Sequence, residues 1–472
     1  MSRLFPILAL LALLPLWACS TYTDHTRQTQ QAVAQGNVDQ ALVAINQHID
    51  ADGPNERPAD LRSEQALYLL ERAMLFQALG DYDQAAQDMI AIDDHLEFTD
   101  FTSETADNIL SLTYSDSSGE YRAPPHERLL LNTMNMINFL ALGQDSSARV
   151  EARRFQTMVE YYIATEPDEI VTDILGLGNY ISGVAFEAGT QNSRAVRHYV
   201  EAYSYGVWPE VDDRRLIDLI NLTGYRGQGL GERRSLVGDL FERASQHPRI
   251  DRDTYRQTHL RGDTLIVVQT GLVPYREAQR IGLNSAVDRT YNSRYRAQHF
   301  DSSTRSRALS LSSENTLNWL NTTRLSHADV PNSRSASLRI DGTQLRLQSP
   351  IKLSTQITQE WDSIATASLA AGISRAVTRL AVGEGVSAGV EAISGSSTLG
   401  TLAGLFSSTT LAIADTPDTR SWTTLPDEIH LIRLPLGEGP RTLNLSVGTG
   451  ADERQVDINP DRFQLFNFSQ LR

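Results

Sequence analysis

Two segments of the N-terminal half repeat one short pattern, and this pattern constrains the fold more than any other feature. Residues 35–41 read Gln-Gly-Asn-Val-Asp-Gln-Ala, and residues 79–85 read Leu-Gly-Asp-Tyr-Asp-Gln-Ala. Weaker copies begin at Gly143 and Gly189, each with an alanine shortly after. A left-handed glycine ends a helix, an Asp or Asn begins the next one, and a buried alanine lets the two helices cross closely. The pattern therefore predicts helix hairpins over residues 32–255.

These segments resemble tetratricopeptide repeats, in which a glycine, an aromatic residue and an alanine recur in a unit of about 34 residues. The repeated glycines here are 44, 63 and 46 residues apart, so the units are irregular. The resemblance implies an irregular TPR-like α-solenoid whose concave groove binds peptides or other proteins. A plain helical bundle is the alternative.

Three charged residues beside the third hairpin are the candidate partner-binding residues. Glu151, Arg153 and Arg154 lie at helical spacing, where they would line the groove and meet a partner's backbone or charges. The alternative interpretation is an ordinary solvated helix face.

From Asp263 the pattern changes, and residues 256–472 are predicted to form a smaller α+β domain with a short sheet. The β-branched run 264–270 predicts a buried strand, and residues 337–345 predict a hairpin around a Gly turn. Further expected elements are a turn or short helix at 274–280, some helix in 284–335, a helix at 358–380, and strands at 428–434, 441–447, 454–458 and 463–468. Residues 20–55 and 417–420 are predicted to be flexible.

A nine-residue stretch in the second half carries a more specific resemblance. Asp418-Thr419-Arg420-Ser421-Trp422-Thr423-Thr424-Leu425-Pro426 is similar to the Asp-x-Arg-x-Trp-x-x-Leu-Pro signature of a family of uncharacterised bacterial lipoproteins with tetratricopeptide-like N-terminal halves. Residues 148–154, 180–183 and 271–274 also resemble that family. The resemblance implies a cell-envelope location and an association with lipoproteins linked to peptidoglycan synthesis.

The first residues have the layout of a secretory signal, predicted to be residues 1–18. Arg3 precedes an apolar stretch over residues 4–16, which is too short for a permanent membrane span of about 20 residues. The motif Leu16-Trp17-Ala18-Cys19 resembles the lipobox of bacterial lipoproteins, which implies lipidation of the Cys19 sulfur. An ordinary signal peptide with a chance cysteine is the alternative.

Cys19 is the only cysteine, so the mature chain forms no internal disulfide. By the same resemblance, Ser20 in place of Asp after the lipidated cysteine implies transfer to the outer membrane. A polar tether is predicted over residues 19–31.

The charge balance argues against a nucleic-acid partner. The net charge is −16, and removal of Arg3 with the signal leaves about −17. Of the 42 basic residues, only Lys352 is a lysine. A nucleic-acid-binding protein needs a basic face, which this composition does not favour. The arginine bias fits either a GC-rich genome or a salt-adapted host.

One motif suggests catalysis. Gly385-Val386-Ser387-Ala388-Gly389 matches the G-x-S-x-G nucleophile elbow, which requires a strand before it and a helix after it. The preceding residues have a helical pattern instead. The ten histidines are scattered without metal-ligand spacing, so neither a metal site nor a cofactor is predicted.

These observations together predict a non-enzymatic lipoprotein, anchored to the outer membrane and facing the periplasm. It would act as a scaffold that binds a protein partner of the envelope, in connection with peptidoglycan synthesis. A serine hydrolase using Ser387 and a component of secretion or surface assembly are the alternatives.

Overall fold

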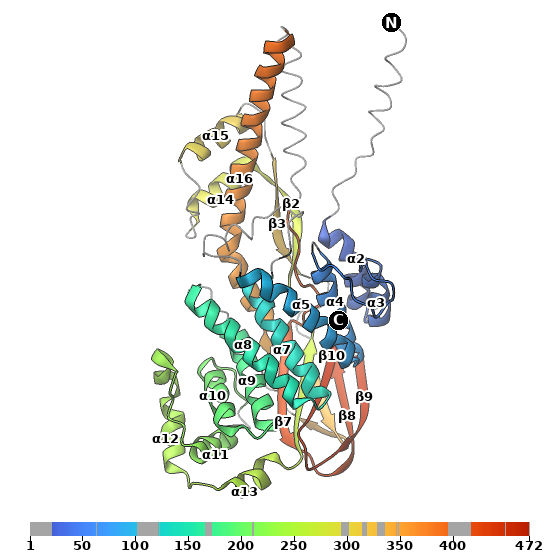
Figure 1. Ribbon diagram of the computed structural model, residues 1–472, viewed down its shortest axis with the longest axis vertical. Helices are drawn as coiled ribbons and strands as arrows, with labels where there is room; N and C mark the ends of the chain where they lie inside the picture. The colour runs from blue at the N-terminus through green and yellow to red at the C-terminus, as the bar shows by residue number, and fades with distance from the viewer. Residues whose placement is uncertain are drawn as a thin grey trace.

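The chain folds into three layers, with helices on one face of a central sheet and a second sheet on its other face (Figure 1). The fold class is α+β, as predicted. The computed structural model describes residues 21–62, 64–101, 121, 123–165, 172–209, 212–293, 302–313, 319–327, 336–345, 347, 349–394, 417–448 and 450–471. None of the helices in these ranges combines the length and the apolar composition that a membrane crossing requires.

The helical layer consists of consecutive antiparallel pairs. Its first eight helices are α2 (Tyr22–Ala34), α3 (Val38–Asn46), α4 (Gln65–Leu79), α5 (Tyr82–Phe101), α7 (Pro125–Ala141), α8 (Asp145–Thr165), α9 (Thr172–Ala188) and α10 (Asn192–Ser204). They are followed by α11 (Asp213–Thr223), η3 (Gly231–Val237), α12 (Gly238–Gln246), α13 (Arg252–Tyr255) and η4 (Arg256–Leu260). Within each of the first four pairs the two helices contact each other, and each pair also contacts the next.

The predicted hairpin turns are confirmed at three of the four positions. Gly36, Gly80 and Gly143 have positive φ angles of 78°, 81° and 69°, and each stands between two helices. At the fourth turn the prediction was wrong in detail, because the left-handed residue is Thr190 (φ 58°) and not Gly189. The alanine of every copy is fully buried, as a close helix crossing requires: Ala41, Ala85, Ala148 and Ala195.

The central sheet has the strand order β10-β1-β7-β6. Its strands are β1 (Asp263–Thr270), β6 (Ile351–Lys352), β7 (Glu428–Pro435) and β10 (Gln464–Gln470). Strand β1 pairs in parallel with β10 and antiparallel with β7. All eight β1 residues are buried because the strand is covered on both faces. Leu265 and Val267 pack into the helical core, whereas Ile266 and Val268 face the second sheet, as the two-residue period of a strand dictates.

The second sheet is antiparallel, with the order β5-β4-β8-β9. Its strands are β4 (Ala336–Ile340), β5 (Thr343–Leu345), β8 (Gly439–Val447) and β9 (Gly450–Ile458). The expected change from helices to strands occurs near residue 256, but a single hydrophobic cluster contains residues from both sides of this boundary. That cluster runs from Tyr22 in α2 to Leu471 after β10. The helical half and the central sheet therefore share one core.

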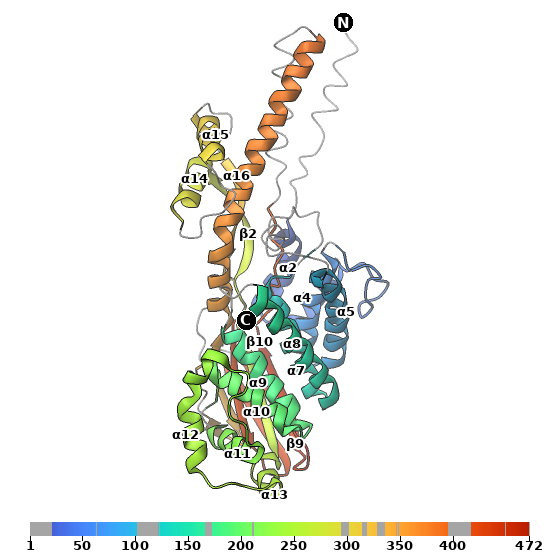
Figure 2. The same cartoon turned by 60° about the vertical axis from the view of Figure 1, so that its left-hand side comes forward.

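A smaller unit projects from this body along α16 (Leu353–Ser394), as Figures 1 and 2 show. Helix α16 has 42 residues, which corresponds to about 63 Å. The unit, which we call the apical subdomain, consists of β2 (Tyr275–Gly282), α14 (Leu283–Asn292), α15 (Ser302–Ser313) and β3 (Trp319–Ser326). Its own core packs against Ala370, Ile373 and Ala376 of α16.

The expectations about residues 19–55 and 274–280 were wrong. Residues 19–31 were expected to be a tether and 20–55 to be flexible, but α2 begins at Tyr22 and α3 follows it. Thr23, Thr26 and Thr29 of α2 are buried. Residues 274–280 were expected to form a turn or short helix, whereas most of them belong to β2, which pairs with β3. In each case contacts from distant parts of the chain outweigh local polarity.

The close crossing of α4 and α5 generates a stability prediction. We expect Ala85→Leu to lower the free energy of unfolding by about 1–3 kcal/mol, because added methylenes overpack a filled core. Gln87→Leu, at an exposed position of the same helix, is the control and should change it by less than about 0.5 kcal/mol. Urea denaturation followed by circular dichroism measures both, and equal effects would contradict the assigned packing.

Candidate functional site

The signature segment, residues 418–426, lies buried between helices α4 and α7. Residues 417–420 were expected to be flexible, but Thr419 and Arg420 are each 1 % exposed. The Arg420 guanidinium donates to both oxygens of Asp418, at 2.8 Å each. The Asp-x-Arg part of the signature is therefore an internal clamp, since it joins two side chains of the same segment.

Glu71 of α4 binds the next part of the signature. Its carboxylate accepts hydrogen bonds from the backbone N–H groups of Thr423 and Thr424, both at 2.8 Å, and from the Thr423 hydroxyl at 2.9 Å. The Tyr22 hydroxyl of α2 donates to the same carboxylate at 2.9 Å. Burial raises the pKa of Glu71, and these donors oppose that shift. One buried carboxylate thus holds α2, α4 and the signature together.

Trp422 is the largest fully buried side chain of the described residues. Its indole N–H donates to the Leu70 carbonyl of α4 at 3.0 Å, and its backbone N–H donates to Glu127 of α7 at 2.9 Å. The Tyr121 hydroxyl also donates to Glu127. The segment therefore fills the space between α4 and α7.

A small pocket adjoins the signature where α7, α16 and β2 meet. Its polar lining includes His126, Glu127, Arg276, Glu360 and Ser421. Its volume is about 20 Å³, enough for one or two water molecules. The pocket therefore suits a small polar group and not a larger substrate.

The pocket contains a buried histidine–carboxylate pair. The Nδ1 atom of His126 lies 2.6 Å from a carboxylate oxygen of Glu360. Burial alone would lower the pKa of His126, but the Glu360 and Glu127 carboxylates together outweigh burial, and the pKa is raised. The Ser421 hydroxyl accepts from the backbone N–H of Arg276 at 3.3 Å. This arrangement joins α7 to α16 by a charge-assisted bond.

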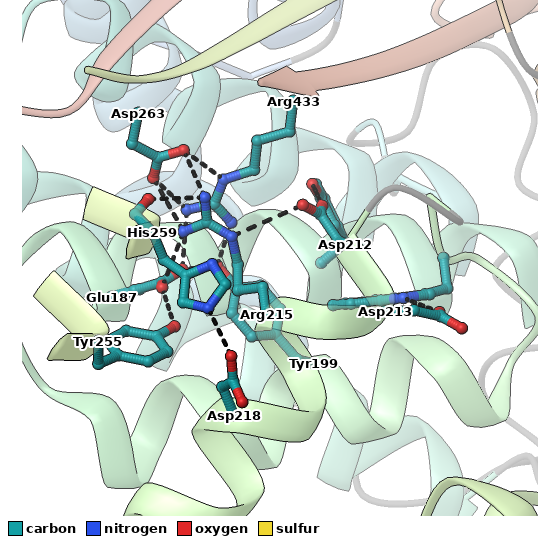
Figure 3. A network of polar contacts seen from close by, with 12 residues as sticks. Glu187, Tyr199, Asp212, Asp213, Arg215, Asp218, Tyr255, His259, Asp263 and Arg433 are labelled. Atoms are coloured by element: carbon teal, nitrogen blue, oxygen red, sulfur yellow. Dashed lines mark hydrogen bonds and ion pairs between the residues drawn. The ribbon is translucent and has the colours of Figure 1, made fainter. Parts of the chain in front are cut away.

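A second polar cluster lies between the helices and the central sheet (Figure 3). The guanidinium groups of Arg215 (α11) and Arg433 (β7) both donate to Glu187 of α9, at 3.0 and 2.8 Å. Both also donate to Asp263 of β1. The Tyr199 hydroxyl donates to Glu187 at 2.6 Å. Burial alone would raise the pKa of Glu187, but the two guanidinium groups hold it well below its ordinary value.

This cluster is a structural element. The charges of Arg215 and Arg433 are matched by acidic partners, so the guanidinium groups are occupied by bonds within the protein. Within the described ranges, no group of three or more His, Cys, Asp or Glu side chains is arranged to hold a metal ion. The cluster ties α9, α11, β1 and β7 together.

The three predicted partner-binding residues have different environments. Glu151 is 2 % exposed and accepts from the Asn132 amide at 3.1 Å, so the expectation that it meets a partner was wrong. Arg154 pairs with Asp93 at 2.8 Å and Asp94 at 3.0 Å within the protein. Arg153 is exposed. The side chains separate because the helix turns Glu151 towards α7 and Arg153 towards solvent.

Cys19 lies outside the described residues. Ser387 lies within α16, so its G-x-S-x-G motif lacks the strand and turn of a nucleophile elbow.

The residues that sequence reasoning missed are Glu71 and Glu127, the acceptors for the signature. Glu71 and the neighbouring Arg72 stand inside the otherwise apolar run of α4, between Leu70 and Ala73. An acidic residue within such a run is a signal of a buried acceptor, because an unpaired buried carboxylate is strongly unfavourable.

Comparison with known proteins adds no relative: the chain matches no protein-family model, no curated protein and no solved structure.

The bonds to Glu71 generate a prediction for the signature. We expect Glu71→Gln to lower the free energy of unfolding by about 2–3 kcal/mol, because the amide replaces one acceptor oxygen by a donor that faces N–H groups. Thr423→Val removes only the hydroxyl bond and should lower it by about 1 kcal/mol. Urea denaturation followed by tryptophan fluorescence measures both. A Glu71→Gln chain as stable as the unaltered protein would contradict the assigned contacts.

Glu151 generates a prediction of pH dependence. Burial raises its pKa from the ordinary 4.5 to about 7. Between these values the unfolded chain has released the proton and the folded chain has not, so stability falls as the pH rises. Glu151→Gln removes this loss. The stability of the variant relative to the unaltered protein should therefore rise by up to about 3 kcal/mol between pH 4.5 and 8.

The matched control is Glu160→Gln, which changes an exposed carboxylate of the same helix. Its effect should stay nearly constant over this range. A Glu151→Gln difference that is equally flat would show that the carboxyl titrates normally.

Proposed function

We propose that this protein is a lipoprotein, anchored through Cys19 to the periplasmic face of the outer membrane, that acts as a protein-binding scaffold of the cell envelope. The observation that carries the proposal is the position of α2. Helix α2 begins at Tyr22, three residues after the sole cysteine, and its first two residues, Tyr22 and Thr23, are buried. An acyl chain on Cys19 would hold the folded body directly at the membrane surface.

The partner-binding surface is the outer face of α8. The inner faces of α4 and α7 contact β10, and the signature lies between these helices. A partner therefore has access to the outer side of the hairpins. Val150, Arg153, Thr157 and Glu160 are exposed on α8 at spacings of three and four residues, which places them on one stripe.

Two resemblances support this assignment. The N-terminal hairpins resemble tetratricopeptide repeats, whose stacked helices bind peptides and proteins on a concave face. Here the signature and the central sheet fill the inner side, so the resemblance supports protein binding in general and the outer face is the accessible side. The signature resembles that of a lipoprotein family associated with peptidoglycan synthesis, so the proposed partner belongs to that envelope machinery. A secretion or surface-assembly component would differ in the partner that it binds.

The experiment has two arms that use the full-length protein in cells. In the first, fractionation and mass spectrometry compare the unaltered chain with Cys19→Ser. We expect the unaltered mature N-terminus to carry the mass of the lipid, and most of the Cys19→Ser protein to leave the membrane fraction, because several acyl chains give firm anchoring.

In the second arm, a photo-crosslinking amino acid replaces Arg153. We expect one defined envelope protein to be crosslinked there and not at Leu236, an exposed residue of η3. Identification of the adduct distinguishes peptidoglycan synthesis from secretion. An unmodified Cys19 would overturn the anchor, and identical adducts at both positions would overturn the scaffold surface.

A further inference from the structure

The start of α2 fixes where a lipid anchor would meet the molecule. The Thr23 hydroxyl donates to the Arg276 carbonyl at the start of β2, at 2.6 Å. The Arg276 guanidinium lies 5.3 Å from the ring centre of Trp361 in α16. The first turn of α2 therefore stands level with Trp361, at the junction between the body and the apical subdomain.

The apical subdomain begins only a short distance further along α16. Its contacts Ala370, Ile373 and Ala376 lie about 14–23 Å beyond Trp361, at 1.5 Å per helical residue. Cys19 precedes Thr23 by four residues, a reach of at most about 14 Å. This inference rests on the proposed lipidation of Cys19, which would place the headgroup plane within that reach.

The body and the apical subdomain lie on opposite sides of this junction (Figures 1 and 2). An anchor at the junction therefore brings both parts near the membrane, and their charges decide which of them contacts it. Their charges differ in sign. Residues 275–327 contain eight arginines and four acidic residues, which is a net charge of +4. Since the whole chain has a net charge of −16, the remaining residues have a net charge of −20. An anionic membrane surface attracts the positively charged apical subdomain and repels the acidic remainder of the chain.

The apical subdomain also exposes aromatic side chains. Trp319, at the start of β3, is 64 % exposed, and Tyr291, in α14, is 41 % exposed. They are the only aromatic residues among the large exposed hydrophobic side chains of the described ranges. Arg280 and Arg289 are exposed in β2 and α14. The Arg305 guanidinium lies 3.8 Å from the ring centre of Tyr291. Exposed tryptophan and tyrosine in an arginine-rich unit are the composition that favours the interface between water and lipid.

We propose that the apical subdomain is a second membrane contact, which binds a phospholipid surface containing anionic headgroups. Trp319 and Tyr291 insert among the headgroups, and the arginines bind the phosphates. Helix α16 continues 18 residues past Ala376, which is about 27 Å. Since no described helix suits a membrane crossing, the membrane surface runs alongside α16 and not across it.

The test uses the chain from residue 19 to 472 with Cys19→Ser, which carries no lipid. Flotation with vesicles of phosphatidylethanolamine and phosphatidylglycerol measures the bound fraction, and phosphatidylcholine vesicles serve as the neutral comparison. We expect binding to the anionic vesicles that weakens with salt. Trp319→Ala should lower the bound fraction at least threefold, whereas Leu236→Ala, which changes a residue 61 % exposed on η3, should not.

The charge contribution has its own matched pair of variants. Arg280→Gln with Arg289→Gln should lower binding to anionic vesicles and reduce its salt dependence. Arg226→Gln with Arg234→Gln, which removes two exposed arginines near η3, should leave binding unchanged. Circular dichroism establishes that each variant is folded.

Absence of vesicle binding by the Cys19→Ser chain, or equal loss in the Trp319 and Leu236 variants, would overturn the inference. Equal binding to neutral and anionic vesicles would overturn the role of the arginines. These outcomes are separate from the fate of the anchor. A lipidated Cys19 with no vesicle binding removes only the apical contact, whereas an unmodified Cys19 with vesicle binding removes only the anchor.

Discussion

The carboxylate of Glu71 connects parts of the chain that are far apart in sequence. It accepts hydrogen bonds from Tyr22 in the first helix and from Thr423 and Thr424 in the signature. The groups it joins are separated by about 400 residues. Because the carboxylate is buried, losing one of these donors leaves an acceptor without a replacement from water. These hydrogen bonds therefore fix α2, α4 and the signature relative to one another.

The consequence is that the helical half does not present an open groove on its inner side. The central sheet contacts α4, α7 and α9, and the signature lies between α4 and α7. The cluster of Glu187, Arg215, Asp263 and Arg433 joins the same two layers further along. Arginine suits such sites because its rigid planar group presents five donors that match the geometry of carboxylates, whereas the lysine ammonium is a compact point charge. Two of the many arginines of this chain therefore have a structural role, since they join the helices to the central sheet.

The hairpins and most strands were predictable because their signals are local. Gly80 with Ala85 marks a helix crossing, and the apolar run of β1 marks a strand buried on both faces. The burial of Tyr22 and Thr419 was not predictable, since polar residues near a terminus or a proline look exposed until a distant partner is known. Glu151 was misassigned because helical spacing does not indicate which side of a helix faces the core. The acceptor role of Glu71 was missed for the same long-range reason.

The central claim is that the helical half and the sheets form one folding unit. Expression of residues 20–255 alone tests it most directly, with the complete mature chain as the reference. Without the sheet and the signature, the inner faces of α4, α7 and α9 would be exposed to water. The account predicts a fragment that lacks a cooperative thermal transition and regains one when residues 256–472 are supplied. A fragment that unfolds cooperatively by itself, at the temperature of the complete chain, would contradict it.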